Sequence, residues 1–225
     1  MKMRGTGKPL TTGVKSLDDI LRGGFERGVL TQVYGPYATG KTTLAMQVGI
    51  LNEGYVAYVD TEGGFSPERL AEIAESRGIK EEVLERFILF TPDSFMEQLR
   101  IVGNLKKIVN RTFSLVVIDS ITSLYRSEER RGLSTVLTRQ LQTLSWIARR
   151  SNVAVIVINQ VHFDSRTGST RPVAEYIMGY RCKDILRLDK LPLPGRRLAV
   201  LERHRNLPEG LMAKFKITEK GLEDV

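Results

Sequence analysis

The feature that most constrains this chain is a phosphate-loop pattern placed between an apolar run and a helical pattern. The pattern is G-x-x-x-x-G-K-[ST], and an apolar run at residues 29–34 precedes it while a helical pattern at residues 44–51 follows it. Glycines let backbone N–H groups turn towards a phosphate, and the helix N-terminus adds partial positive charge. The sequence therefore predicts a nucleotide-phosphate site made by Gly35, Pro36, Tyr37, Ala38, Thr39, Gly40, Lys41, Thr42 and Thr43.

The same pattern predicts a magnesium site. Lys41 should reach the β- and γ-phosphates, and the Thr42 hydroxyl should bind Mg²⁺. An apolar run at residues 115–118 ends in the carboxylate of Asp119, which is typical of a strand that holds the water shell of that ion. We therefore expect Thr42 and Asp119 to hold Mg²⁺, partly through water.

Hydrolysis also needs a group that orients and activates water. Glu62 lies just past the expected strand 55–60, where its carboxylate can accept a proton from the attacking water, and Asp60 is the alternative. Gln160 follows the apolar run 153–158, and an amide there can report the state of the γ-phosphate to the next loop. The alternative for Gln160 is an ordinary hydrogen bond at a strand end.

Short apolar runs alternate with longer helical patterns along most of the chain, which is the signature of βαβ units. We expect a single α/β domain over residues 1–225, with a mostly parallel central sheet flanked by helices. Beyond residue 180, three more strands joined by short turns should lie antiparallel at one edge. The expected strands are 29–34, 55–60, 86–90, 115–119, 153–158, 184–188, 197–201 and 213–217, and the expected helices are 41–52, 67–77, 94–110 and 133–150. Trp146 should lie in the core.

The basic charge of the chain is concentrated in one stretch. The net charge is +8, yet residues 1–125 carry 15 Lys/Arg and 15 Asp/Glu, whereas residues 126–206 carry 16 Lys/Arg and 7 Asp/Glu. A localised excess of this kind is what a polyanion-binding face needs, and the alternative is a solvated Arg-rich surface. No helix-turn-helix or zinc-finger pattern is present, so binding to DNA should not depend on sequence.

Cysteine count and hydropathy exclude several other classes. One cysteine allows no internal disulfide framework, and the longest apolar run, residues 153–158, is too short to cross a bilayer. No signal peptide pattern is visible at the N-terminus. We therefore expect a cytoplasmic protein with no membrane partner.

Taken together and in order, these motifs resemble the RecA/RadA family of recombinase ATPases, and the resemblance covers nearly the whole chain. Within that family the chain is most similar to the short archaeal paralogues. The motifs are Leu-Thr-Thr-Gly at 10–13, the phosphate loop, Asp-Thr-Glu at 60–62, Phe-Ser-Pro-Glu-Arg-Leu at 65–70, Asp-Ser at 119–120, Asn-Gln-Val at 159–161 and Leu-Pro-Glu-Gly at 207–210.

The resemblance implies a RecA-like core with ATP and Mg²⁺ as cofactors. It implies that Glu62 is the catalytic carboxylate, that Gln160 senses the γ-phosphate, and that Arg69 stacks on the adenine. It also implies two DNA-binding loops, around residues 125–135 and 162–178. Their candidate DNA-binding residues are Arg126, Arg130, Arg131, Arg166 and Arg171, all within the basic stretch.

Three departures from the family pattern bear on function. Only nine residues, none aromatic, precede Leu10, so the helix-hairpin-helix domain and the segment that docks neighbouring subunits into a filament are expected to be absent. The second loop reads Pro-Val-Ala-Glu at 172–175, where recombinases typically carry Pro-Val-Gly-Gly. The family's proline that caps a neighbour's ATP is replaced within residues 202–205, so Arg203 and Arg205 are candidate arginine fingers acting in trans.

These observations favour an ATP- and DNA-binding recombination and repair protein that regulates or mediates recombination. We expect a weak Mg²⁺-dependent ATPase with little dependence on DNA, acting beside the nucleoid as a monomer or small oligomer. Its partners should be single-stranded or branched DNA and the cell's main recombinase or a junction nuclease. The alternatives are a competent filament-forming strand-exchange enzyme and a RecA-fold signalling ATPase with a protein partner.

Overall fold

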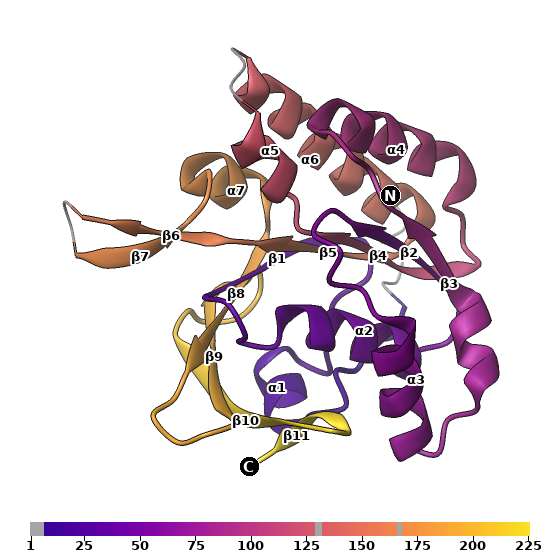
Figure 1. Cartoon of the computed structure of the whole chain (residues 1–225), viewed down its shortest axis with the longest axis vertical. Helices are drawn as coiled ribbons and strands as arrows, with labels where there is room; N and C mark the ends of the chain where they lie inside the picture. Colours follow the sequence, from indigo (N-terminus) through magenta and orange to yellow (C-terminus); the bar gives the residue numbers. More distant parts are fainter. Residues whose placement is uncertain (1–6, 129–131, 166–167) are drawn as a thin grey trace.

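The structure, a computed structural model, describes residues 7–128, 132–165 and 168–225. Its core is a nine-stranded sheet in the order β11-β10-β9-β8-β1-β5-β4-β2-β3 (Figure 1). The six strands from β8 to β3 are parallel, and β9, β10 and β11 continue the sheet in antiparallel fashion. The strands of this sheet are β1 (Leu30–Tyr34), β2 (Tyr55–Asp60), β3 (Phe87–Phe90), β4 (Phe113–Asp119), β5 (Ala154–Asn159), β8 (Asp184–Lys190), β9 (Arg196–Arg203), β10 (Leu211–Thr218) and β11 (Gly221–Asp224).

Helices α3 and α4 begin where the sequence supplies side-chain caps. The Ser66 hydroxyl accepts the N–H of Arg69 at 3.1 Å and Pro67 takes the first helical position, so α3 begins there. The Ser94 hydroxyl likewise accepts the N–H of Glu97 at 3.2 Å at the start of α4. The helices are α1 (Lys15–Ile20), α2 (Lys41–Leu51), α3 (Pro67–Ser76), the 3₁₀ turn η1 (Glu81–Arg86), α4 (Phe95–Ile108), α5 (Ser123–Ser127), α6 (Leu133–Ser151) and α7 (Glu175–Arg181).

Helices cover both faces of the sheet. Helices α1, α2 and α3 lie on one face, and α4, α5, α6 and α7 lie on the other (Figure 1). Two apolar clusters fill these layers, and alternate residues of a strand join opposite clusters: Leu115 packs with the α2 side and Val116 with the α6 side. Because both faces of the parallel strands are buried, β4 and β5 have no exposed residue, as their near-continuous apolar sequences predict.

The predicted fold class is confirmed, and the differences concern details. Strand β8 pairs parallel to β1 and antiparallel to β9, so the switch of direction falls one strand later than expected. A hairpin made of β6 (Val161–Asp164) and β7 (Ser169–Pro172) projects beyond the sheet (Figure 1) and was not predicted. The prediction that Trp146 lies in the core is wrong, because its side chain is 43% exposed beside Lys106. No helix among the described residues is long and apolar enough to cross a bilayer.

Candidate nucleotide site and its neighbouring loops

The carboxyl ends of the parallel strands meet at one edge of the sheet, and a cleft of about 610 Å³ opens there. The phosphate loop between β1 and α2 forms one wall of this cleft. Glu62, Asp119 and Gln160, which follow or end β2, β4 and β5, face it from the other strands. The structure therefore brings together the groups that the sequence predicted for nucleotide binding and hydrolysis.

Two glycines make the loop conformation feasible. Gly40 precedes α2 with φ 95°, in the left-handed region that glycine adopts without strain. A Cβ atom on Gly35 would lie 2.0 Å from the carbonyl oxygen of Leu188, so no side chain fits at that position. The Lys41 ammonium donates to the carbonyl oxygens of Gly35 and Pro36 at 2.9 and 2.8 Å, so it lies in the mouth of the loop. Burial lowers the pKa of Lys41, although Asp119 and Glu62 act in the opposite direction.

Thr42 and Asp119 form a pair suited to Mg²⁺. The Thr42 hydroxyl donates to Asp119 Oδ2 at 2.6 Å, and the buried Tyr58 hydroxyl donates to the same oxygen at 2.8 Å. Burial raises the pKa of Asp119 to about 6, against the effect of these two hydrogen bonds. A hydroxyl and a carboxylate oxygen are ligands that Mg²⁺ prefers, so the residues present fit a magnesium-bound nucleotide. Sequence reasoning missed Tyr58, because nothing in a strand pattern marks a buried hydroxyl.

The geometry favours Glu62 over Asp60 as the group that orients water. Asp60 accepts four backbone N–H groups, from residues 62 to 65, at 2.9–3.2 Å, so both of its oxygens are used to shape the loop after β2. Glu62 instead faces the cleft. Its Oε1 accepts Gln160 Nε2 at 2.7 Å and the hydroxyl of Ser120, a residue to which sequence reasoning gave no role. The role of Glu62 stays a prediction.

Arg69 also lines the cleft, held by the turn between β10 and β11. Its guanidinium donates to the carbonyl oxygens of Thr218 and Glu219 at 2.5 and 2.7 Å, and it pairs with Glu72 at 3.1 Å. Hydrogen bonds to a guanidinium lie in its plane, so these bonds do not use the flat faces on which a ring would stack. The arrangement is compatible with the predicted adenine contact, which stays a prediction.

The structure places two of the five candidate DNA-binding arginines. Arg126, at the end of α5, donates to Gln160 Oε1 at 3.1 Å and lines the nucleotide cleft. Arg171, on β7, pairs with Asp164 and with Glu175, both at 3.4 Å. The other three, Arg130, Arg131 and Arg166, lie outside the described residues.

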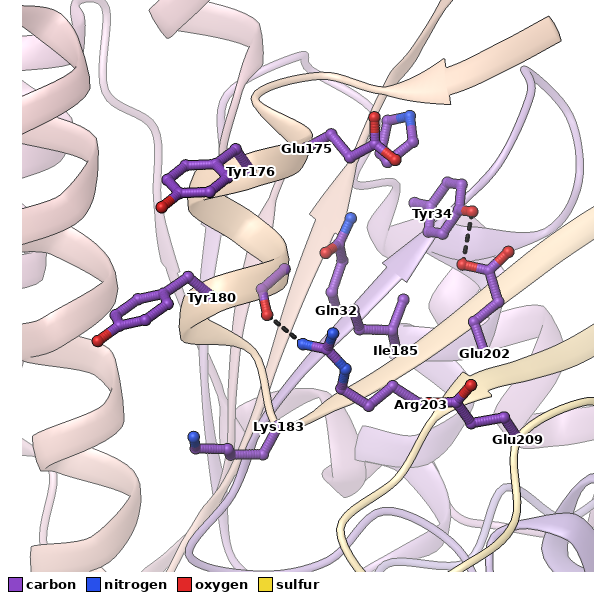
Figure 2. Close-up of a pocket in the computed structure, with 12 residues that line it drawn as sticks. Gln32, Tyr34, Glu175, Tyr176, Tyr180, Lys183, Ile185, Glu202, Arg203 and Glu209 are labelled. Carbon is purple, nitrogen blue, oxygen red and sulfur yellow. Dashed lines mark hydrogen bonds between the residues drawn. The ribbon is translucent and has the colours of Figure 1, made fainter.

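The two candidate fingers lie apart from this chain's own nucleotide cleft. A second cavity, of about 640 Å³, is lined by Gln32 and Arg203 among others (Figure 2), and there the Arg203 guanidinium donates to the carbonyl oxygen of Gly179. Tyr34 donates to Glu202 at 2.7 Å at another part of its wall. Arg205 instead forms a two-nitrogen ion pair with Glu26. Of the two candidates, Arg203 therefore has the weaker intramolecular attachment.

Fold and cleft together define a RecA-type nucleotide-binding core, and comparisons with known proteins identify its family. The Rad51 family profile matches residues 6–225. The chain belongs to the Rad51 family and, within it, to the archaeal RadB group, as its motifs predicted.

Relatives of that group match nearly end to end. The DNA repair and recombination protein RadB of Thermococcus kodakarensis is 69% identical over 218 residues, which is 96% of this chain and 99% of the relative. The protein of the same name from Pyrococcus furiosus is 62% identical, with 96% of each chain covered. A crystal structure described as the RadB recombinase superposes with a TM-score of 0.89 at 68% identity, covering 96% of this chain and 99% of that one.

Proposed function

We propose that this chain is an ATP- and DNA-binding recombination and repair protein with a weak Mg²⁺-dependent ATPase, and that it regulates or mediates recombination. ATP would lie on the phosphate loop, with Mg²⁺ between Thr42 and Asp119. Glu62 would accept the proton of the attacking water, and Lys41 would bind the phosphates. This assignment is in keeping with the names of the relatives, which are called DNA repair and recombination proteins.

The observation that carries the proposal is a hydrogen-bonded chain from a basic loop to the catalytic carboxylate. Arg126 donates to Gln160, and Gln160 donates to Glu62, at 3.1 and 2.7 Å. A DNA phosphate that binds Arg126 competes with the amide oxygen of Gln160 for the same guanidinium. The three side chains therefore offer a direct physical link between DNA at the first loop and water activation at the nucleotide.

Features of the second loop support a regulator over a strand-exchange enzyme. This loop forms the hairpin of β6 and β7, and Asp164 and Glu175 compete with a DNA phosphate for Arg171. The Arg171 side chain is 39% exposed, so each of these ion pairs is worth only about 0–1 kcal/mol, which weakens a phosphate contact without preventing it. Ala174 adopts φ 51°, a conformation that strains alanine but not glycine, and alanine reaches fewer other backbone conformations than the glycine typical of recombinases, so this loop is less free to rearrange.

Arg203 is the better of the two candidate fingers for a nucleotide held by a second subunit. An arginine finger delivered in trans is worth about 10³–10⁵ in turnover, so a chain that does not assemble stably should hydrolyse ATP slowly. We expect a monomer or small oligomer near the nucleoid in the cytoplasm. Its protein partner would be the cell's main recombinase or a junction nuclease.

Single-turnover hydrolysis and strand exchange, measured with the full chain, test this proposal. We expect Mg²⁺-dependent ATP hydrolysis that single-stranded DNA stimulates less than tenfold, and no exchange of a labelled strand out of a homologous duplex. Arg126→Gln should abolish the response of hydrolysis to DNA and keep ATP affinity, whereas the exposed-lysine control Lys214→Gln should change neither. Strand exchange by the chain alone with ATP would instead establish the recombinase alternative.

A further inference from the structure

A compact group of cations lies where α4 and α6 end side by side. The Ser151 hydroxyl donates to the carbonyl oxygen of Val109 at 2.9 Å, so the two helix ends are in contact. The Lys106 ammonium lies 5.4 Å from the centre of the Trp146 ring, across the same seam. Figure 1 shows α4 and α6 next to each other on one face of the sheet. We call the exposed residues here the helix-end patch: Lys106, Lys107, Arg111, Trp146, Arg149 and Arg150.

The two segments that form this patch carry no acidic residue. Residues 98–118 and 132–163 contain no Asp or Glu, and none of the five cations forms a salt bridge with a residue that the structure describes. Arg27 and Lys8 continue the basic surface. The Arg27 guanidinium donates to the Lys8 carbonyl at 3.2 Å, and Gly28 next to it donates to Val153 just beyond α6. Glu26, also next to Arg27, is occupied by Arg205.

Favourable helix-end electrostatics explain only part of this arrangement. A cation in the last turn of a helix gains about 0.3–1 kcal/mol from the helix dipole, and α4 and α6 each carry two such residues. The same residues repel one another across the seam, however, and Arg111 lies beyond the helix. The dipole also gives no reason for the exposure of Trp146. Five unpaired cations around an exposed aromatic ring form a surface that a polyanion would stabilise.

The patch lies far from the nucleotide and from the loops beside it. Helices α4 and α6 end next to the amino ends of β4 and β5, whereas the nucleotide cleft lies at their carboxyl ends. Strand β4 runs from Phe113, beside the patch, to Asp119 in the cleft. At about 3.3 Å per residue, its length separates the two regions by roughly 20 Å. A phosphate held at the patch would therefore contact neither Arg126 nor the hairpin of β6 and β7.

We propose that the helix-end patch is a second DNA-binding surface, which binds the phosphate backbone of a duplex without regard to sequence or to bound ATP. Packed helices lie about 8–10 Å apart, so cations from α4 and from α6 are spaced on the scale of a duplex groove, about 6–12 Å wide. Rigid helix ends also suit the fixed phosphate spacing of a duplex. This surface goes beyond the proposed function, because the loops remain free to hold another strand.

Trp146 provides a direct test, because it is the only tryptophan of the chain and lies within the patch. Titrating the full chain with a 30-base-pair duplex should change the tryptophan fluorescence, equally with and without ATP. The change should persist in Arg126→Gln, which weakens the first loop. Loss of the fluorescence change in Arg126→Gln would assign duplex binding to the loop and overturn the proposal.

A neutralised variant measures the contribution of charge. It carries Lys106→Gln, Lys107→Gln, Arg149→Gln and Arg150→Gln, and its matched control carries Arg22→Gln, Lys80→Gln, Lys214→Gln and Lys220→Gln at exposed sites elsewhere. Each duplex phosphate contact contributes about −0.9 to the slope of log affinity against log salt, so two to four lost contacts should flatten the slope by about 2–4 units. An unchanged slope, or one that the control flattens as much, overturns the proposal.

Two further measurements keep the result decisive. Fluorescent-nucleotide binding and thermal unfolding report whether the neutralised variant is folded. If it is not, the double variant Arg149→Gln with Arg150→Gln replaces it, and the salt slope should then flatten by up to about 2 units. Polyglutamate of similar length serves as a competitor of different chemistry. If it displaces the duplex at equal charge concentration, the surface is one for acidic proteins and the proposal fails. Single-strand binding at the loops is scored separately by anisotropy, so the proposed function can fail or stand independently.

Discussion

Replacement of Glu62 by glutamine should abolish hydrolysis while keeping nucleotide binding. Glu62 Oε1 accepts hydrogen bonds from Gln160 and Ser120, and the amide oxygen of a glutamine can accept both. The side chain should therefore stay in place, and what is lost is the ability to take a proton from water. A positioned general base contributes about 10²–10⁴ in rate, which corresponds to about 2.7–5.4 kcal/mol of transition-state free energy.

A single-turnover assay with enzyme in excess over labelled ATP suits this slow reaction. Lys41→Ala measures any contaminating ATPase, because that variant should not bind the nucleotide. We expect Glu62→Gln to hydrolyse ATP at least a hundredfold more slowly than the unmodified chain. Its affinity for a fluorescent ATP analogue should be unchanged or higher, because a negative charge near the phosphates is removed.

Asp60→Asn is the matched control, since it removes a carboxylate two residues away. Asp60 Oδ2 accepts only the N–H of Phe65, so the amide can keep the three bonds at Oδ1 and lose that one. Leaving one donor unsatisfied costs about 1–3 kcal/mol, or roughly 2–4 °C in Tm for each kcal/mol. Hydrolysis should fall much less than in Glu62→Gln. If Glu62→Gln hydrolyses ATP at the original rate, or if Asp60→Asn is the variant that loses hydrolysis, the assignment of Glu62 is wrong.

Three further predictions concern nucleotide, DNA and assembly. Lys41→Ala should lose binding of a fluorescent ATP analogue, because the loop loses its one full positive charge; retained affinity would contradict the phosphate-loop role. The three arginines of the first loop are Arg126, Arg130 and Arg131. Neutralising all three should flatten the slope of log affinity for single-stranded DNA against log salt by about 2 units, at roughly 0.7 per phosphate contact, and should leave ATP binding unchanged. Fluorescence anisotropy between 50 and 300 mM salt (a range chosen for the assay) would measure this slope. If Arg203 acts in trans, mixing Glu62→Gln with Arg203→Ala should restore hydrolysis above that of either alone, whereas Arg205→Ala should destabilise the chain by freeing Glu26.

The parallel layers of the fold could be predicted because their strands are buried on both faces. Continuous apolar runs placed β4 and β5 within two residues of their observed bounds. The same reasoning failed where sequence pattern and burial diverge. Strands β6 and β11 have only four residues each, too few for a periodic signal. Trp146 follows the apolar period of α6 yet lies on the margin of its buried face, where Lys106 from another helix covers part of the ring.

The residue types of the candidate site could also be predicted, but their contacts could not. A strand-end position indicates that a carboxylate or amide faces the cleft, which sufficed for Glu62, Asp119 and Gln160. It did not reveal that Arg126 reaches Gln160, because the two residues lie 34 positions apart and meet only after β4 and β5 pair. Nor did charge counting distinguish Arg171, which two carboxylates hold, from Arg149, which forms no salt bridge within the part of the chain that the structure describes.

The contact between Arg126 and Gln160 also limits how strongly DNA and ATP can influence each other. Binding effects between two sites are reciprocal, so whatever DNA does to nucleotide affinity, the nucleotide must do to DNA affinity. If the coupling passes through one charge-assisted hydrogen bond, it is worth about 1.5–3 kcal/mol at most. Part of that is lost because the Arg126 side chain is exposed to solvent. Reciprocity does not extend to turnover, so weak stimulation of hydrolysis by DNA is a separate prediction: this single exposed contact should transmit less than about 1.4 kcal/mol, or tenfold, and groups supplied by a second subunit would raise it further.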